Sequence, residues 1–322
     1  MIVFSDLHLD SDSAEVCLGQ ILPGICEAAI NSDRHVVFLG DWWHLRYRVD
    51  VRLQVAVLDE LRRWAEKKVV ARLLVGNHDQ VDVAGRNALE VFSDLPNVWV
   101  YLNPVLDYDF VWLPYRRDTS AYDPAIPYTA GRTIFLHQSV VGAWDNNHHQ
   151  TKDGFSYNQL EGARVFAGHF HKRQFVELGD TPVWFVGSPR QVTAAESAQD
   201  KGFCVLDGAS VDFVNTNWGS RYHRFELAEN EVLDLSGVKD GDDVRVVVAQ
   251  ETDVEKVGRQ LDGLNVRHTV TPQVKSAGAR HALDPESDLR AYAQAWICER
   301  DRDESRLMPV FDSIAGVEKC IS

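Results

Sequence analysis

The chain has 322 residues, of which 45% are hydrophobic and 25% are charged, and its net charge is −15. This length and composition predict a globular protein with one large core and a smaller second one, and no apolar run approaches the roughly 20 residues that cross a bilayer. Because the negative charge is spread along the chain, attraction to nucleic acid would have to come from bound metal, a local basic patch or a partner subunit.

The first residues, MIVFSDLHLD, form a short apolar run that ends in acids and a histidine. A signal peptide would carry bases and a cleavage site there, so we expect a cytoplasmic protein that makes no contact with a membrane. The five cysteines are odd in number, scattered and never spaced as CxxC. They argue against a disulfide framework and a thiolate zinc site, and we expect them to be small buried side chains.

Five apolar runs in the first two-thirds of the chain alternate with amphipathic stretches, which is the pattern of an α/β layer fold. Each run favours a strand and ends in polar residues: MIVFSD, HVVFLGD, ARLLVGNHD, RTIFLHQ and ARVFAGHFH. Ligands collect at the carboxyl ends of strands in such sheets, so the five ends predict one site built from five loops.

Between the second and third runs, VDVRLQVAVLDELRRWAEKK predicts a helix over residues 50–67. One face of this helix carries Val51, Val55, Leu58, Leu61 and Trp64. Such a face either packs on the sheet or supplies a contact between subunits.

After the fifth run, TPVWFVGSPRQVT, GFCVLDG, VDFVNTN and YHRFEL predict consecutive strands of a second sheet, which would complete a two-sheet sandwich. The polar stretch AENEVLDLSGVKDGDD predicts a boundary between a domain of residues 1–228 and one of residues 229–322. In the second domain, a strand, a helix and a strand precede DPESDLRAYAQAWICERD, a helix with an acidic start, so we expect a small α+β module.

The polar residues at the five predicted strand ends are Asp6, His8, Asp41, Asn77, His78, His137, His169 and His171. Alternate residues of an extended chain share a face, so the DxH and HxH pairs can each direct two side chains toward one point. Carboxylate, imidazole and amide ligands suit ions such as Mn²⁺ or Fe²⁺, and two ions about 3.5–4 Å apart can clamp a phosphodiester and activate a water. The set predicts a site for two metal ions rather than a group of structural histidines.

The five motifs DLH, GD, GNHD, FLH and GHFH resemble the signature of the calcineurin-like metallophosphoesterases over roughly residues 1–190. The resemblance implies a two-sheet sandwich flanked by helices and two divalent ions, most readily Mn²⁺, with Mg²⁺ and Fe²⁺ as alternatives. By this resemblance, one ion would be held by Asp6, His8, Asp41 and His171, and the other by Asp41, Asn77, His137 and His169, with Asp41 as the bridge.

The same resemblance gives roles to the two residues that follow Asn77. His78 adjoins a ligand without being one, so it would face the phosphate and stabilise the transition state or protonate the leaving oxygen. Asp79 would orient the imidazole of His78, as carboxylates near metal sites commonly do.

The segment GDWWHLRYR places His44 three residues after Asp41 and mixes arginines with aromatic residues. This mixture suits a polynucleotide, although a solvated helix start with buried tryptophans gives the same pattern. The spacing of His44 resembles the SbcD-type nuclease subunits of SMC-associated DNA repair complexes, and VGSPRQVTAAESAQDKGFCVLD resembles their Gly-Ser-Pro segment. The candidate DNA contacts are Arg46, Arg48, Arg52, Ser188 and Arg190. The polar loop of residues 146–149 is interpreted as solvated, with contact to DNA as the alternative.

That second resemblance implies a DNA exonuclease or endonuclease that works as a homodimer with an SMC-like ATPase in recombination or repair, and whose C-terminal piece is a capping domain. The short tail DESRLMPVFDSIAGVEKCIS and the acidic balance depart from the larger members and resemble compact phage-encoded versions. The alternatives are a stand-alone phosphodiesterase or phosphatase for a small phosphoester, with the C-terminal module as a lid, and a metal-free scaffold, which would be expected to have lost ligands.

Overall fold

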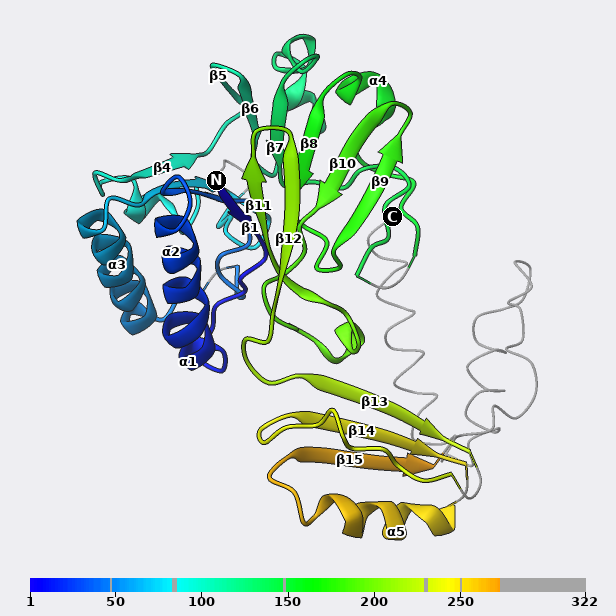
Figure 1. Ribbon diagram of the computed structural model, residues 1–322. Helices are drawn as coiled ribbons and strands as arrows, with labels where there is room; N and C mark the ends of the chain where they lie inside the picture. The colour runs from blue at the N-terminus through cyan, green and yellow to red at the C-terminus, as the bar shows by residue number, and fades with distance from the viewer. Residues whose placement is uncertain (47, 83–85, 147–148, 229–230, 250, 273–322) are drawn as a thin grey trace, which may run out of the picture. The chain divides into compact units, whose positions relative to one another are not determined.

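The computed structural model describes residues 1–46, 48–82, 86–146, 149–228, 231–249 and 251–272 (Figure 1). The helix predicted from DPESDLRAYAQAWICERD and the tail that follows it lie outside the described residues. Of the five cysteines, Cys17, Cys26 and Cys204 are buried free thiols, as predicted, and Cys298 and Cys320 are outside the described part. No helix within the described ranges is long and apolar enough to cross a membrane.

The first sheet has six strands in the order β12-β11-β1-β2-β3-β4. Their bounds are β1 Ile2–Phe4, β2 His35–Phe38, β3 Val70–Leu74, β4 Val98–Tyr101, β11 Lys201–Asp207 and β12 Ser210–Thr216. The first four run parallel, while β11 pairs antiparallel with both β1 and β12. Phe4 pairs with Phe38, and Phe38 with Leu73, so β1, β2 and β3 end at the same level of the sheet.

The second sheet also has six strands, in the order β5-β6-β7-β8-β10-β9. Their bounds are β5 Val105–Asp107, β6 Phe110–Leu113, β7 Thr133–Leu136, β8 Arg164–Ala167, β9 Gln174–Leu178 and β10 Thr181–Phe185. The four inner strands are parallel and the two edge strands antiparallel to them. Leu136 pairs with Ala167, so β7 and β8 also end together.

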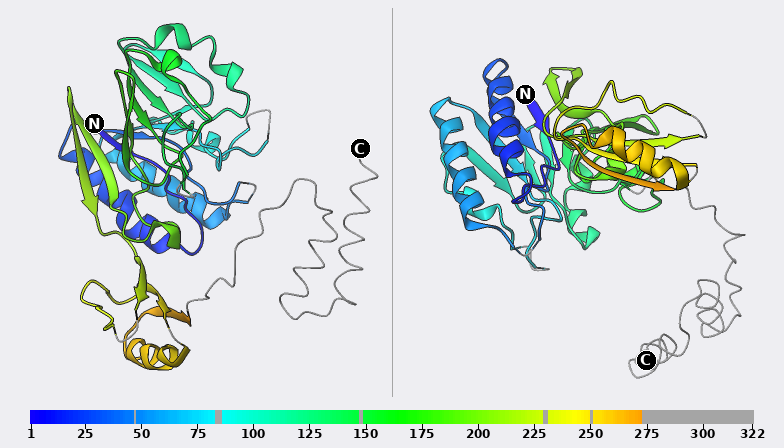
Figure 2. Two further views of the ribbon diagram at one scale, coloured as in Figure 1. Left: turned by 90° about the vertical axis from the view of Figure 1, so that its right-hand side faces the viewer. Right: turned by 90° about the horizontal axis from the view of Figure 1, so that it is seen from below.

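The two sheets pack face to face, and helices cover the outer face of the first (Figure 2). Buried Val37 and Leu74 of the first sheet meet Phe135 and Phe166 of the second in one cluster. The helical segments are α1 Ala14–Val16, a π-helical turn Cys17–Ile21, α2 Leu22–Ile30, α3 Val51–Glu66 and α4 Tyr157–Leu160. Single 3-10 turns occupy Glu90–Phe92, Thr119–Tyr122, Ile126–Tyr128 and Ala194–Glu196. The predicted α/β two-sheet sandwich flanked by helices is therefore confirmed.

The helix α3 begins where the carboxylate of Asp50 accepts a hydrogen bond from the amide of Arg52. Part of its predicted apolar face is buried and part is exposed to solvent. Leu61 and Trp64 are fully buried against the first sheet, whereas Val51 is 69% exposed and Val55 49% exposed. The helix therefore packs through its second half and leaves apolar side chains uncovered near its start.

The strands that follow β10 differ from the prediction of one continuous second sheet. The strands β11 and β12 return to the first sheet, and β13, Tyr222–Leu227, pairs in parallel with β14, Asp243–Val248. A further strand, β15 at Arg267–Pro272, completes a three-stranded sheet that α5, Glu251–Leu261, covers. Period-two alternation identifies a strand and its buried face but not its partner, which explains the error.

The expected division into residues 1–228 and 229–322 stays a prediction. The pairing of β13 with β14 places strands from both sides of that boundary in one sheet. The α+β character expected for the C-terminal module agrees with β14, α5 and β15.

Candidate metal centre

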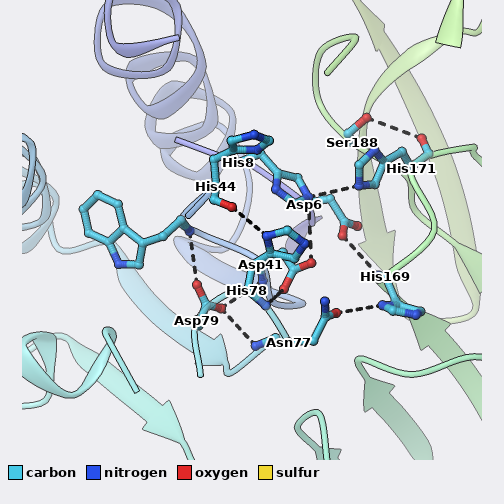
Figure 3. Close-up of polar contacts among 12 residues, drawn as sticks. Asp6, His8, Asp41, His44, Asn77, His78, Asp79, His169, His171 and Ser188 are labelled. Carbon is cyan, nitrogen blue, oxygen red and sulfur yellow. Dashed lines mark hydrogen bonds and ion pairs between the residues drawn. The ribbon is translucent and has the colours of Figure 1, made fainter. Parts of the chain in front are cut away.

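The seven predicted ligands follow the carboxyl ends of five strands and meet at one place, and Figure 3 labels six of them. They are Asp6 and His8 after β1, Asp41 after β2, Asn77 after β3, His137 after β7, and His169 and His171 after β8. The strand ends are aligned within each sheet and the sheets are stacked, so residues up to 165 positions apart become neighbours.

One group of potential ligands consists of Asp6, His8 and His171, which can offer ligand atoms within 4.8 Å of one another. The Nε2 atoms of His8 and His171 lie 3.0 Å apart. Two imidazole nitrogens at this distance in a buried site indicate a position where both could bind one cation.

A second group consists of Asp41, His137 and His169, again with ligand atoms within 4.8 Å of one another. The Oδ1 atom of Asn77 lies 3.0 Å from Nε2 of His137 and 2.8 Å from Nδ1 of His169. Asp41 stands between the groups, with Oδ2 3.7 Å from Nε2 of His8 and Oδ1 3.3 Å from Nε2 of His137. A residue in this position can contribute to both.

The backbone is strained at four of the seven positions. Positive φ angles occur at Asp6 (52°), His8 (48°), Asp41 (62°) and His169 (83°), and such conformations cost on the order of 1–3 kcal/mol each. Hydrogen bonds between loops hold two of them, because the amide of Asp6 donates to the carbonyl of Gly40 and that of His8 to the carbonyl of Asp41. These hydrogen bonds keep the backbone in the strained conformation, and the side chains of Asp6 and His8 then point into the cluster of ligands.

The glycines of the GD and GNHD motifs lie so close to candidate ligands that a side chain would not fit at either position. Gly40 has a φ of +102°, and a Cβ atom there would collide with the imidazole of His137. A Cβ atom at Gly76 would collide with the backbone nitrogen and Oδ1 of Asp41. Any larger residue at either position would displace a candidate ligand.

Burial and neighbouring charges adjust the protonation of the cluster. Burial lowers the pKa of His8 and of His169, the latter to about 3, so both imidazoles are neutral near pH 7. Burial opposes the ionisation of Asp41, but the neighbouring histidines, His137 above all, hold its pKa well below the ordinary value. Burial also disfavours charge on His137, yet Asp41 raises its pKa to about 9. A cation and a proton would therefore compete for the space between these two residues.

The residues fit divalent ions. Oδ2 of Asp6 is buried and has no hydrogen-bond partner among the described residues. Burial raises the pKa of this carboxyl group, since nothing nearby compensates its charge fully. An unpaired buried carboxylate oxygen is costly, and a cation among carboxylate, imidazole and amide donors would remove that cost.

Polar groups around the cluster contact the ring nitrogens of the ligands that face away from it. His137 directs Nδ1 to the carbonyl oxygen of Leu39, 2.5 Å away, which leaves Nε2 facing the cluster. The carboxylate of Glu196 lies 2.9 Å from Nδ1 of His171. Burial opposes its ionisation, but His171 and Lys201 hold the pKa of Glu196 far below its usual range. Sequence reasoning missed Glu196, although the spacing Thr193-x-x-Glu196 matches a capping box, which the structure contains.

Asn146 makes two hydrogen bonds to the backbone that the sequence did not predict. Its Oδ1 accepts a hydrogen bond of 2.8 Å from the amide of His171, and its Nδ2 donates to the carbonyl of His169 at 3.4 Å. This side chain is exposed, as expected, and it also bonds to the backbone of both histidines of the HxH motif. His149 is exposed, as expected, while the intervening residues 147 and 148 lie outside the described part.

His78 is held by groups other than the one expected. Its amide donates to Oδ1 of Asp41 at 2.7 Å, and its Nδ1 lies 2.7 Å from the carbonyl oxygen of His44. A carbonyl can only accept, so Nδ1 carries a proton and Nε2 is left as the nitrogen that can accept or deliver another. The expected orientation of this imidazole by Asp79 is therefore replaced by the backbone of His44.

Asp79 instead fixes the backbone of two loops. Its Oδ2 accepts hydrogen bonds from the amides of Asp41 and Gly76, both at 2.9 Å, and its Oδ1 from those of Trp42 at 2.9 Å and Trp43 at 3.1 Å. Burial and then the charge of Asp41 raise the pKa of Asp79 to about 7, against the amides, which favour the ionised form. Four converging N–H groups account for this carboxylate without any contact with His78.

The candidate DNA contacts are not equivalent. Arg46 and Arg48 are exposed, and Arg52 is exposed but paired with Asp50 at 2.7 Å. Ser188 is 1% exposed and bonds to neighbouring protein groups, so it is not available to DNA in this conformation. The guanidinium of Arg190 donates to the carbonyl of His8 at 3.0 Å, which gives this residue a structural contact.

The aromatic residues beside His44 belong to the core. Trp42 and Trp43 are buried among the side chains that join the helices to the first sheet, so they cannot stack on bases. The ring of His44 lies 6.1 Å from that of His78, with 27° between their planes, and burial lowers its pKa. Of the sequence features that suggested a polynucleotide, Arg46 and Arg48 are exposed and His44 is half-buried, and within the described residues neither arginine has an ion pair.

No protein-family model matches the chain, and no curated protein matches it. Among solved structures, the chain is similar to the crystal structure of Pseudomonas putida nuclease MPE, with 16% sequence identity and a TM-score of 0.32. The match covers 63% of this chain and 82% of that chain. The fold and the site together define an α/β sandwich whose buried His/Asp cluster could bind divalent metal ions.

The contacts of Asp79 predict the result of replacing it by Asn. Whichever way the amide is turned, its NH₂ group faces two backbone N–H donors, so Asp79→Asn should lower the free energy of unfolding by about 2–4 kcal/mol. Urea denaturation of metal-free protein in the presence of chelator measures this without a contribution from metal binding. Asp59→Asn, on the exposed surface of α3, is the control and should change stability little. Equal stability of the two variants would contradict the structural role of Asp79.

Proposed function

We propose that the chain is a dimetal phosphodiesterase of the calcineurin-like metallophosphoesterase type, and that it acts as an SbcD-type DNA nuclease. The observation that carries the proposal is the position of Asp41 between two buried groups of ligand atoms, with the amide of His78 bonded to its Oδ1. Asp6, His8, Asp41 and His171 would hold one ion and Asp41, Asn77, His137 and His169 the other. When bound, two divalent ions, Mn²⁺ for preference, supply charge neutralisation at the phosphate and activation of a water.

His78 is the candidate for proton transfer. The carbonyl of His44 fixes the proton on Nδ1, so Nε2 is the atom that would hold a proton for the leaving oxygen or stabilise charge on the phosphate. The hydrogen bond from the amide of His78 to Oδ1 of Asp41 fixes the backbone of His78 beside Asp41. Asp41 thus holds the backbone of His78 and the carbonyl of His44 holds its imidazole. A ligand atom of this ring also lies within 4.8 Å of those of His8 and Asp41, and we propose that it acts on the phosphate rather than on a metal ion.

His44 has two separable parts. Its carbonyl oxygen positions His78, while its side chain lies beside His8 and His78 at the start of a loop that also carries the exposed Arg46 and Arg48. We propose that this side chain orients the end of a DNA duplex toward the metal ions. The burial of Trp42 and Trp43 removes the base-stacking argument and favours the alternative of a phosphodiesterase for a small phosphoester, so substrate choice has to be tested directly.

The two-ion assignment predicts different losses for two neighbouring residues. Asp41→Ala should abolish binding of the ion pair and all turnover, because both groups share that carboxylate. His78→Ala should retain the ions and reduce turnover of bis(p-nitrophenyl) phosphate by about 100- to 10,000-fold. Elemental analysis of each purified variant, combined with turnover measured with Mn²⁺, tests the assignment. A metal-free His78→Ala protein, or one with nearly full activity, would contradict the role given to His78.

The nuclease proposal makes a prediction for His44→Ala. The substitution keeps the backbone carbonyl that holds His78, so hydrolysis of bis(p-nitrophenyl) phosphate and of flexible single strands should survive. Misplaced duplex ends should be processed about 100-fold more slowly. Both activities are measured on one preparation of known metal content, with the adjacent exposed Leu45→Ala as the control. Equal loss of the two activities would assign His44 to the metal centre generally, and loss of neither would favour the small-phosphoester alternative.

We also propose that the chain works as a homodimer with an SMC-like ATPase. Support comes from the exposed Val51 and Val55, one turn apart on α3, and from the net charge of −15, which makes strong DNA binding by the chain alone unexpected. Light scattering should find a dimer that Val51→Glu/Val55→Glu dissociates, whereas Val91→Glu, on another exposed segment, should not. A strict monomer at tens of micromolar would contradict the dimer, and tight, salt-resistant DNA binding by the chain alone would contradict the need for the partner.

A further inference from the structure

The segment VGSPRQVTAAESAQDKGF surrounds His171 and supplies a buried ion pair behind it. The carboxylate of Glu196 and the ammonium of Lys201 are 2.6 Å apart, and both side chains are 4% exposed. Glu196 contacts Nδ1 of His171 at 2.9 Å, and Lys201 donates to the carbonyl oxygen of His171 at 2.8 Å. The pair therefore holds the imidazole and the backbone of the same residue.

The remaining bonds of the pair are satisfied. Oε1 of Glu196 accepts from the amide and hydroxyl of Thr193 at 3.1 and 3.2 Å, and Oε2 accepts from the amide of Val192 at 3.1 Å. Nζ of Lys201 donates to Oγ of Ser188 at 2.8 Å and to Gln199 at 3.2 Å, besides His171. A buried pair is tolerated when each charge is compensated in this way. The network is thus a rigid support rather than a loose contact.

His171 differs in its support from the other imidazoles of the cluster. A carboxylate holds its Nδ1, so the proton lies on that nitrogen and the lone pair of Nε2 points toward Nε2 of His8. In contrast, a neutral carbonyl holds Nδ1 of His137, and Nδ1 of His169 faces Asn77 inside the cluster. Within the described residues, Nδ1 of His8 has no hydrogen-bond partner. The anionic support therefore acts on the group formed by Asp6, His8 and His171.

We propose that Glu196 and Lys201 are positioning residues that set the affinity of the ion held by Asp6, His8 and His171, and leave the affinity of the other ion unchanged. This inference rests on the proposed two-ion site. A carboxylate that accepts from the distal nitrogen of a ligating histidine fixes its tautomer and raises its basicity, and the loss of such a partner costs about 10- to 100-fold in metal affinity. Among the described residues, no hydrogen bond or ion pair joins Asn77, His137 or His169 to the pair, so the affinity of their ion should not change.

The test is a calorimetric titration of metal-free full-length protein with Mn²⁺. The wild type should show two binding events, of which His171→Ala removes one and Asn77→Ala weakens the other, so each event is assigned. Glu196→Gln, which keeps the size of the side chain, should weaken the His171 event about 10- to 100-fold and leave the Asn77 event unchanged. Glu196→Gln/Lys201→Met, which also removes the charge of the lysine, should give the same selective loss.

Thermal melting of the metal-free variants separates this role from a purely structural one. If the pair only stabilised the fold, Glu196→Gln would lower the melting temperature and either leave both metal affinities unchanged or reduce both equally. That result would overturn the inference but not the proposed two-ion site. A wild-type protein that bound fewer than two ions would instead overturn the proposed function. Selective weakening of the His171 event in both variants, with folding retained, is the expected result.

Discussion

The arrangement of the site depends on one buried carboxylate, that of Asp79, and the four backbone amides that converge on it. These amides belong to two loops, one after β2 and one after β3, whose strands are adjacent and parallel. A carboxylate with both oxygens occupied by two donors each locks the loops at a fixed spacing. That spacing places Asp41 between the two ligand groups and brings the amide of His78 to Asp41.

The cost of this geometry is distributed through the fold. Four candidate ligands have positive φ angles and most are almost fully buried, so the local conformation would not persist in an isolated loop. Hydrogen bonds from the loop after β1 to the loop after β2 hold two of them. The aromatic core between the sheets holds the second sheet, with His137 and His169, at a fixed distance from the first. Packing thus determines the separation of the ligand groups.

The histidines of the site are distinguished by what binds their other nitrogen. The backbone of His44 holds His78, the backbone of Leu39 holds His137, and Glu196 holds His171. A carbonyl fixes a tautomer, whereas a carboxylate also increases the electron density on the ring. The three residues are all histidines, but their hydrogen-bond partners give their imidazole rings different basicity and orientation. The segment that carries Glu196 also bonds to the third sheet, since Gln191 accepts from the amide of Tyr222 at 2.6 Å.

The sequence alone determined the class of fold and the convergence of seven candidate ligands, because both follow from local patterns: apolar runs that define strands, and polar residues directly after parallel strands. Tertiary structure alone decided which strands pair, so β11 and β12 join the first sheet and β13 a third. It also buried Trp42, Trp43 and Ser188, and gave Asp79 its amides and His171 its carboxylate. Asp79 is 38 residues from Asp41 and Glu196 is 25 from His171. Contacts at such separations are set by the stacking of sheets and the path of loops, which no local spacing encodes.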